Sequence, residues 1–335
     1  NEKDIPIAQY FGDDAGKTEY REYLSDRYGR YKMAFSGIHL NYSFGEALLR
    51  AGKAYVIMDS DYYEAVKNDA PAIFEAYRDQ FYVRLAENCV AYSWILTAVM
   101  AASPVCDSSF VEKGRIGGDL FQGLATVRCS ELGYWNFFAP ILDYTSAAAY
   151  ADSIQSYIDS GMIRYPSELY YPIRLKNFGP YSLEGLKEGI SHIELRMVDL
   201  NPLVRSGIDE RDVLFSQLFL VWAAAQAPAN LTVKDQVQAV QNFKNAAHYD
   251  LKTVKIVMPD GTACSVVKAA KRIIDAMEAF FDDFGTSVHE CLAFQRLKFE
   301  DPHTRYAWKI REEYGQGFVA RGLQLARKLQ KGYVE

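Results

Sequence analysis

Acidic and basic side chains alternate with apolar ones in the stretch SHIELRMVDLNP, residues 191–202. A β-strand projects successive side chains to opposite faces, so His192, Glu194 and Arg196 would share one face and the apolar residues between them the other. The apolar face predicts contact with a core. The polar face has two interpretations: a solvated surface with an ion pair, which is common and weak, or a site that binds a cation and an anion.

A second stretch, FSGIHLNYSF at residues 35–44, has the same period of two. Gly37, His39, Asn41 and Ser43 would form its polar row, and apolar side chains the other. A lone histidine on a strand is often a structural residue held by hydrogen bonds. If both strands belong to one sheet, however, its face away from the core carries Glu, Arg, His and Asn together. That set suits a metal ion and a polyanion.

The composition is that of a globular protein which acts on a small substrate. The 335 residues are 49% hydrophobic and 24% charged, and the formal net charge is -6. No basic stripe stands out, so we expect no nucleic-acid partner. The longest apolar runs, near Trp94 and Leu218, are too short to cross a bilayer and predict buried helices rather than membrane spans.

Five cysteines lie far apart and include no CxxC motif. Their odd number and spacing indicate neither a zinc site nor a disulfide framework, so reduced thiols in a cytoplasm are expected. The chain opens on Asn1 in the stretch NEKDIPIAQY, which reads as the middle of a loop. We expect further sequence upstream.

Helices and a mostly antiparallel sheet are the elements that must position the polar rows. An apolar stripe predicts one long helix over 71–102, and a second helix is expected to begin after Asp209 and end before Pro228. Further helices are expected over 233–247 and 263–284, followed by two more before Gly332. The segments 121–136 and 167–182 read as loop and short strand. The pattern predicts an α+β fold, with a sheet-containing catalytic portion at 1–230 and a mainly helical portion of the same domain at 231–335.

Several long motifs resemble those of one enzyme family, and they occur in the same order. The chain is similar to the bacterial glutamate–cysteine ligases, and most similar to the ligase domain of Gram-positive enzymes fused to a glutathione synthetase module. The resemblance is strong over residues 4–230 and weak beyond. It is carried by the motifs DIPIAQY, YREYLSDRYG, SGIHLNYSFGEAL, ASPV, YYPIRLKN and ISHIELRMVDLNPLVRSGI.

The resemblance implies a glutamine-synthetase-like fold, in which helices surround a curved antiparallel sheet. It also implies ATP-dependent joining of the γ-carboxylate of L-glutamate to the amine of L-cysteine through a γ-glutamyl phosphate, the first step of glutathione biosynthesis. Two anions meet in that reaction, so Mg²⁺ and fixed cations must neutralise charge. By resemblance Glu194 is a ligand of Mg²⁺, with Mn²⁺ as an alternative, and Arg196 reaches the phosphates. His39 lies at the metal and phosphate cluster, where it bonds either the metal or a phosphate.

Substrate residues follow from the same motifs. Arg128 matches the arginine that holds glutamate, and its planar guanidinium suits a carboxylate. Arg174 is a further candidate for phosphate contact. The residues that match the cysteine pocket are Tyr134, Tyr170, Tyr20, Arg21 and Leu24.

Departures from the family pattern leave alternatives open. The family begins with a segment that carries further acidic metal ligands, so we expect that segment upstream, on a second polypeptide, or lost in a degenerate relative. Met33 stands where relatives have a glutamine near the acceptor, and a thioether lacks the amide's hydrogen-bonding groups. No glutathione synthetase module is recognised within the 335 residues. The alternatives are therefore a γ-glutamyl ligase for another amine, or a non-catalytic chain that binds glutamate or a nucleotide.

Overall fold

The computed structural model describes residues 5–50, 71–110, 118–315 and 317–332. Within these ranges the helices α1 to α6 are α1 (Gly16–Tyr28), α2 (Arg30–Met33), α3 (Glu46–Arg50), α5 (Pro71–Tyr92) and α6 (Trp94–Met100). They are followed by α7 (Ala147–Asp159), α8 (Leu183–Glu188), α9 (Glu210–Ala225), α10 (Val233–Ala246), α11 (Val266–Phe280), α12 (Thr286–Glu300), α13 (Tyr306–Tyr314) and α14 (Phe318–Lys331). The strands are β1 (Ile38–Tyr42), β2 (Cys106–Asp107), β3 (Asp119–Leu120), β4 (Ile173–Asn177), β5 (Ile190–Val198), β6 (Lys255–Val257) and β7 (Ala263–Ser265). The expectation of a loop at the first residues falls partly on 1–4, outside the described residues.

The two polar strands of the sequence do belong to one sheet. Its strand order is β1-β5-β4, and both pairs of neighbours run antiparallel. The register of β1 against β5 shifts between Ile38 and Leu40, where His39 of β1 faces both Arg196 and Met197 of β5, so the extra residue of the bulge lies in β5. A bulge re-aims side chains and locally disrupts the ladder. The predicted period of two is therefore confirmed for β1, and β5 follows it between its own register irregularities.

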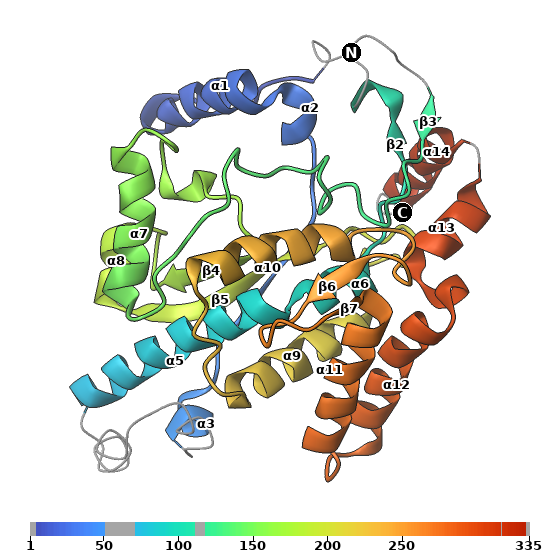
Figure 1. Cartoon of the computed structure of the whole chain (residues 1–335). Coiled ribbons are helices and arrows are strands. Elements are labelled where there is room, and N and C mark those ends of the chain that lie inside the picture. The colour runs from blue at the N-terminus through green and yellow to red at the C-terminus, as the bar shows by residue number, and fades with distance from the viewer. Residues whose placement is uncertain (1–4, 51–70, 111–117, 316, 333–335) are drawn as a thin grey trace.

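The apolar row of β5 faces the core. Ile193 and Leu195 are fully buried, and Met197 is 3% exposed. Helix α5 packs against β4 and β5, and α6 packs against β5. In Figure 1, α5 lies across these two strands. Each fully buried Ile or Leu side chain stabilises the fold by about 1.5–3 kcal/mol. Burial of this row therefore fixes the strand register and holds the polar row of β5 on the opposite face.

Two predicted helix ends are confirmed at α9. Its N-cap is Asp209, whose side chain accepts from the Arg211 backbone N–H, and the helix ends at Ala225, before Pro228. The prediction of one helix over 71–102 is wrong at Ser93, where α5 ends and α6 begins. The Ser93 hydroxyl donates to the carbonyl of Cys89, 2.5 Å away. This side chain bond to the preceding turn competes with the backbone ladder and bends a helix.

The C-terminal portion departs from prediction in two places. Residues 263–265, expected to begin a helix, form β7, which pairs with β6, and α11 begins at Val266 with Ser265 as its N-cap. Beyond α11 the described chain forms three α-helices, α12, α13 and α14, where two were expected. Short breaks at Pro302 and Gly315 separate them, since Pro begins a 3-10 turn and Gly315 has a positive φ of 52°.

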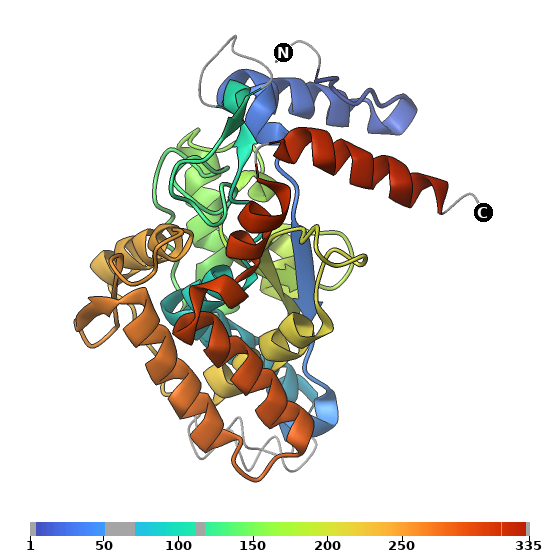
Figure 2. The ribbon, with the colours of Figure 1, turned by 90° about the vertical axis from the view of Figure 1, so that its right-hand side faces the viewer.

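One apolar cluster extends from Leu49 to Phe299 and so includes residues of both predicted portions. The boundary at residue 230 stays a prediction. Figure 2 shows α1 and α14 at one end of the molecule and the α11–α12 hairpin at the other. Within the described ranges, none of the helices combines the length and the apolar character needed to span a membrane.

Candidate active site

A polar row crosses all three strands of the sheet at Glu194. In the register of the sheet, Arg174 of β4 and Asn41 of β1 lie directly opposite Glu194 of β5. His39 of β1, opposite the bulge, reaches the same carboxylate, with its Nδ1 3.1 Å from Glu194 Oε1. The prediction that Glu, Arg, His and Asn gather on one face is confirmed. The alternative of a solvated surface is wrong for Glu194 and Arg174, which are 6% and 8% exposed.

Glu194 is ionised and shared between cations. Its Oε2 accepts from Arg196 Nη1 at 3.0 Å, and Arg174 Nη1 lies 3.8 Å away. Burial alone would raise the pKa of Glu194, but the His39 hydrogen bond and the two guanidinium groups outweigh it and hold the pKa far below its usual range. A buried carboxylate that stays charged is a suitable ligand for a hard cation.

Cations outnumber this carboxylate on the same face. Burial and the neighbouring Arg174 lower the pKa of Arg196 to about 10. Burial, with Arg174 and Arg196 nearby, also lowers the pKa of Lys176, whose Nζ lies 4.6 Å from the ring centre of Tyr181. Three basic side chains around one carboxylate leave an excess of positive charge. Such a face attracts a polyanion such as a nucleotide phosphate group.

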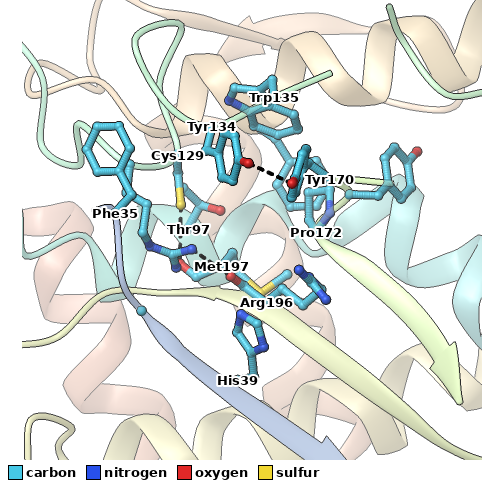
Figure 3. A pocket seen from close by; sticks show the side chains of 14 residues that line it. Phe35, His39, Thr97, Cys129, Tyr134, Trp135, Tyr170, Pro172, Arg196 and Met197 are labelled. Carbon is cyan, nitrogen blue, oxygen red and sulfur yellow. Dashed lines mark hydrogen bonds between the residues drawn. The ribbon is translucent and has the colours of Figure 1, made fainter. Parts of the chain in front are cut away.

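A cavity of about 230 Å³ opens beside this row, toward the loop that follows Arg128. His39 and Arg196 line its wall on the sheet side, and Tyr134 and Tyr170 face them across it (Figure 3). Arg128 also lines the cavity. Five of the predicted site residues, distant in sequence, are therefore brought together around one space.

Arg128 is bound to the end of the sheet. It donates through Nη1 to the Arg196 carbonyl at 2.9 Å and through Nη2 to the Val198 carbonyl at 2.7 Å. Its Nε donates to the carboxylate of Asp199 at 3.2 Å. A guanidinium has five N–H groups, so two are left for a ligand. The predicted contact with glutamate stays a prediction, and the residue also has a structural role that the sequence did not indicate.

Tyr134 and Tyr170 form a hydroxyl pair at the other side of the cavity. Their oxygens are 2.6 Å apart, and the ring centres lie 3.9 Å apart. Burial and, for Tyr170, the neighbouring Tyr134 raise both phenol pKa values well above the ordinary range, so both hydroxyls stay protonated. Each can then donate or accept a hydrogen bond to a small polar ligand.

Three predicted pocket residues on α1 are not among those that line the cavity. Tyr20 bonds Ser167 at 3.2 Å, Arg21 donates to Tyr10 at 3.1 Å, and Leu24 is buried at 8% exposure. Met33, at the end of α2, does not line the cavity either, although Phe35 and Gly37 do. Glu194 lies behind His39 and Arg196 rather than on the cavity wall.

Asp199 and two glycines support the site but were not singled out from the sequence. Asp199 is 3% exposed and accepts from Arg128, Ser103 Oγ and the Ala102 backbone. A Cβ at Gly37 would lie 2.5 Å from Arg128 Cζ, and one at Gly133 would lie 1.9 Å from the Arg128 carbonyl. The glycine of SGIH, inside one motif of the resemblance, and the glycine directly before Tyr134 were the available signal for these close approaches.

Glu194 and His39 lie 3.1 Å apart, and their predicted role as metal ligands stays a prediction. Nowhere in the described ranges do three or more His, Cys, Asp or Glu side chains gather closely enough to form a metal site. Mg²⁺ in nucleotide-dependent enzymes usually takes one or two protein carboxylates and completes its shell with water and phosphate oxygens. The charged Glu194 carboxylate fits that partial role. His39 is a less usual ligand for so hard an ion and suits a phosphate oxygen equally.

Comparisons with known proteins identify the relatives of this chain. Residues 1–167 and 139–246 match the family model described as glutamate-cysteine ligase. A glutathione biosynthesis bifunctional protein of Listeria welshimeri is 31% identical over 97% of this chain, and one of Clostridium perfringens is 26% identical over 98%. The chain spans about two fifths of these relatives, 42% of each.

Solved structures show the same fold. The glutamate–cysteine ligase of Francisella tularensis, crystallised with AMP, superposes with a TM-score of 0.82 at 21% identity, covering 99% of this chain and 71% of that one. A bifunctional glutathione synthetase of Pasteurella multocida gives a TM-score of 0.74 at 21% identity over 98% of this chain and 41% of that one.

The fold is therefore α+β, an antiparallel sheet surrounded by helices, as in these two solved structures. The match to the family model over more than half of the sequence then makes the assignment specific. The chain belongs to the glutamate–cysteine ligase family.

Proposed function

We propose that this chain carries the catalytic site for ATP-dependent ligation of the γ-carboxylate of L-glutamate to the amine of L-cysteine. The observation that supports the proposal most directly is the row of Arg174, Arg196 and Lys176 around the single buried carboxylate of Glu194. It lies beside a cavity of amino-acid size. The proposal places the reaction in the cytoplasm, with which the free state of all five cysteines is compatible.

The reaction has two steps. A γ-carboxylate oxygen of glutamate attacks the γ-phosphorus of ATP, forming an acyl phosphate as ADP leaves. The amine nitrogen of cysteine then attacks the acyl carbon, a C–N bond forms, phosphate departs with the electrons of the C–O bond, and the nitrogen loses a proton. Mg²⁺, held in part by Glu194, would supply charge neutralisation on the phosphates.

The residues of the chain have separate tasks in this scheme. Arg196 and Arg174 would stabilise the charge that spreads over the transferred phosphoryl oxygens, in a site where burial strengthens electrostatic interactions. The free N–H groups of Arg128 would orient the glutamate carboxylate. Arg128 could do so while it keeps its hydrogen bonds to the carbonyls of β5. The protonated hydroxyls of Tyr134 and Tyr170 would hold the acceptor amino acid at the far wall.

Product analysis with the full-length protein tests the proposal. We expect ADP release that requires glutamate, cysteine and Mg²⁺ together, and a product with the mass of γ-glutamylcysteine. With glutamate alone, hydroxylamine should trap the activated carboxylate as a hydroxamate. Cysteine consumption without glutamate, or a preference for a different amine over cysteine, would contradict the assignment of the substrates.

Gly37→Ala is expected to weaken glutamate binding specifically. The added methyl group would lie 2.5 Å from Arg128 Cζ, so the guanidinium must shift. Misplacement of a positioning group by about 1 Å can reduce the rate by about 10²-fold, and here we expect the loss mainly as a higher KM for glutamate. Gly45→Ala is the matched control, because a Cβ there meets nothing within 4 Å. Equal KM values for glutamate in both variants would separate Arg128 from that substrate.

Met33→Gln is expected to leave acceptor choice unchanged. Met33 is not among the residues that line the cavity, so an amide at this position gains no contact with a bound amino acid. The ratio of kcat/KM for cysteine to that for α-aminobutyrate should agree with the wild-type ratio within about 2-fold. The two amino acids differ by one small group, which supplies only about 10 to 200-fold discrimination in total. A larger change would place residue 33 at the acceptor site.

A further inference from the structure

Asn136 is a buried amide that joins two segments of the candidate site. The residue is only 8% exposed. The Oδ1 atom accepts from the backbone N–H of Tyr170 at 2.7 Å, and Nδ2 donates to the Glu168 carbonyl at 2.9 Å. Asn136 lies two residues after Tyr134. One side chain therefore fixes the segment of Tyr134 against the segment of Tyr170.

Glu168 extends this connection as a fully buried carboxylate. Its Oε1 accepts from the hydroxyl of Tyr28 at 2.8 Å and lies 3.3 Å from Arg27 Nε, and its Oε2 accepts from the Arg164 backbone at 2.7 Å. Tyr28 and Arg27 both belong to α1. The carboxylate thus ties the last turn of α1 to the segment that carries Tyr170.

Tyr28 completes the connection and touches the cavity wall. Its hydroxyl accepts from Asn136 Nδ2 at 3.2 Å while it donates to Glu168. Its ring meets Tyr134 edge-on at 5.3 Å and Tyr170 edge-on at 5.4 Å, between ring centres. Burial, followed by the Glu168 carboxylate, raises the pKa of Tyr28 to about 12, so the hydroxyl stays a donor. The phenol ring therefore sets the depth and tilt of both cavity tyrosines.

We infer that Asn136, Glu168 and Tyr28 form a positioning network that fixes the Tyr134–Tyr170 hydroxyl pair and thereby determines the binding of the acceptor amino acid. None of the three residues lines the cavity, so they act through the tyrosines (Figure 3). The inference rests on the proposed function, because it assigns the tyrosine pair to the acceptor. On the sheet side of the cavity, Arg196 and His39 are held by hydrogen bonds to Glu194, which is outside this network.

Two substitutions separate this role from general stability. Asn136→Ala removes the bonds to Tyr170 and Glu168, and Tyr28→Phe removes the hydroxyl while it keeps the ring contacts with both tyrosines. The control is Asn88→Ala. Asn88 is fully buried, and its amide likewise bonds a carbonyl and a backbone N–H, those of Ala223 and Ala229, both at 2.9 Å, away from the cavity.

We expect Asn136→Ala to raise the KM for cysteine by about 10-fold or more, because a lost positioning bond acts on orientation. The KM for glutamate and ATP should change by less than about 3-fold. Tyr28→Phe should show a smaller shift of the same kind. Asn88→Ala should lower Tm without changing the KM for cysteine. If Asn136→Ala lowers Tm and changes the KM values no more than the control does, the network is structural only and the inference is wrong.

Backbone hydrogen exchange provides a readout that does not depend on the reaction. The Tyr170 amide should exchange faster in Asn136→Ala than in the wild type, because this variant removes the acceptor of its hydrogen bond. In Asn88→Ala the exchange rate of the Tyr170 amide should be unchanged. A wild-type protein that joins no glutamate to cysteine would overturn the proposed function, and with it the acceptor assignment. Unchanged exchange at Tyr170 would overturn the positioning role itself.

Discussion

Replacing Glu194 with glutamine is expected to reduce the ligation rate by about 10²-fold or more, the loss typical of removing one preorganised electrostatic group. The change keeps the volume but removes the anionic oxygen that a hard cation requires. It also leaves Arg174 and Arg196 beside each other without the carboxylate that separates their charges. The loss should therefore fall on kcat, and the remaining activity should need higher Mg²⁺ concentrations. Initial rates across a Mg²⁺ titration measure both effects.

Destabilisation must be separated from this loss. Breaking a buried ion pair by removing one partner lowers the free energy of unfolding by about 3–5 kcal/mol, so Glu194→Gln should also unfold at lower denaturant concentration. Asp212→Asn is the matched control, since Asp212 is 2% exposed and pairs with Lys298 at 3.0 Å, away from the cavity. It should destabilise to a similar degree while the folded enzyme keeps its rate. Near-normal activity of Glu194→Gln at low Mg²⁺ would refute the proposed role of the carboxylate.

Arg196→Lys should be almost as severe although it preserves the charge. The Arg196 guanidinium already donates to Glu194 through Nη1 and still has N–H groups directed to the cavity that it lines. A lysine ammonium is a compact point charge and cannot bond a carboxylate and a phosphate oxygen in the same planar geometry. We expect kcat to fall by about 10²-fold, and the apparent affinity for ATP to fall with it. Single-turnover measurement of ADP formation isolates the phosphoryl transfer.

Arg305→Lys serves as the control for buried arginine. Arg305 is 3% exposed and donates to the carbonyls of Tyr249 and His248, at 2.5 and 3.2 Å, remote from the polar row. Its substitution should change stability and leave ADP formation intact. A wild-type rate of ATP turnover in Arg196→Lys would make Arg196 a structural ion-pair partner of Glu194 and nothing more.

The sequence predicted the polar face well because strand periodicity is local information. The alternation in residues 191–198 required the apolar row to be buried, and this placed Glu194 and Arg196 together before any neighbour was known. Cap chemistry was equally local, and Asp209 is the N-cap of α9 as predicted. Assembly of His39, Arg128, Tyr134 and Tyr170 around one cavity depended on long motifs of the family, since their separations along the chain reveal no contact.

Side-chain partners distant in sequence could not be predicted in this way. Asp199 is only one residue beyond β5, yet its role follows from Arg128, 71 residues earlier in the chain. The break at Ser93 depends on the orientation of its hydroxyl, and the β6–β7 hairpin depends on pairing between two strands. The spacing of apolar residues indicates neither of these. The absence of Tyr20, Arg21 and Leu24 from the cavity lining reflects the docking of α1, which rests on the buried Glu168. Their role at the acceptor stays a prediction.

The bonds of Arg128 have a consequence for the sheet. Where β5 has an extra residue opposite His39 of β1, the carbonyls of Arg196 and Val198 accept hydrogen bonds from the two amino groups of Arg128. The side chain thus supplies donors that the neighbouring strand does not, at a strand end where Met197 and Val198 are buried and an unpaired carbonyl would be costly. Loss of this arginine would leave those two carbonyls without this donor at the strand end that carries Arg196, so the stability of that strand end and the shape of the cavity depend on one guanidinium.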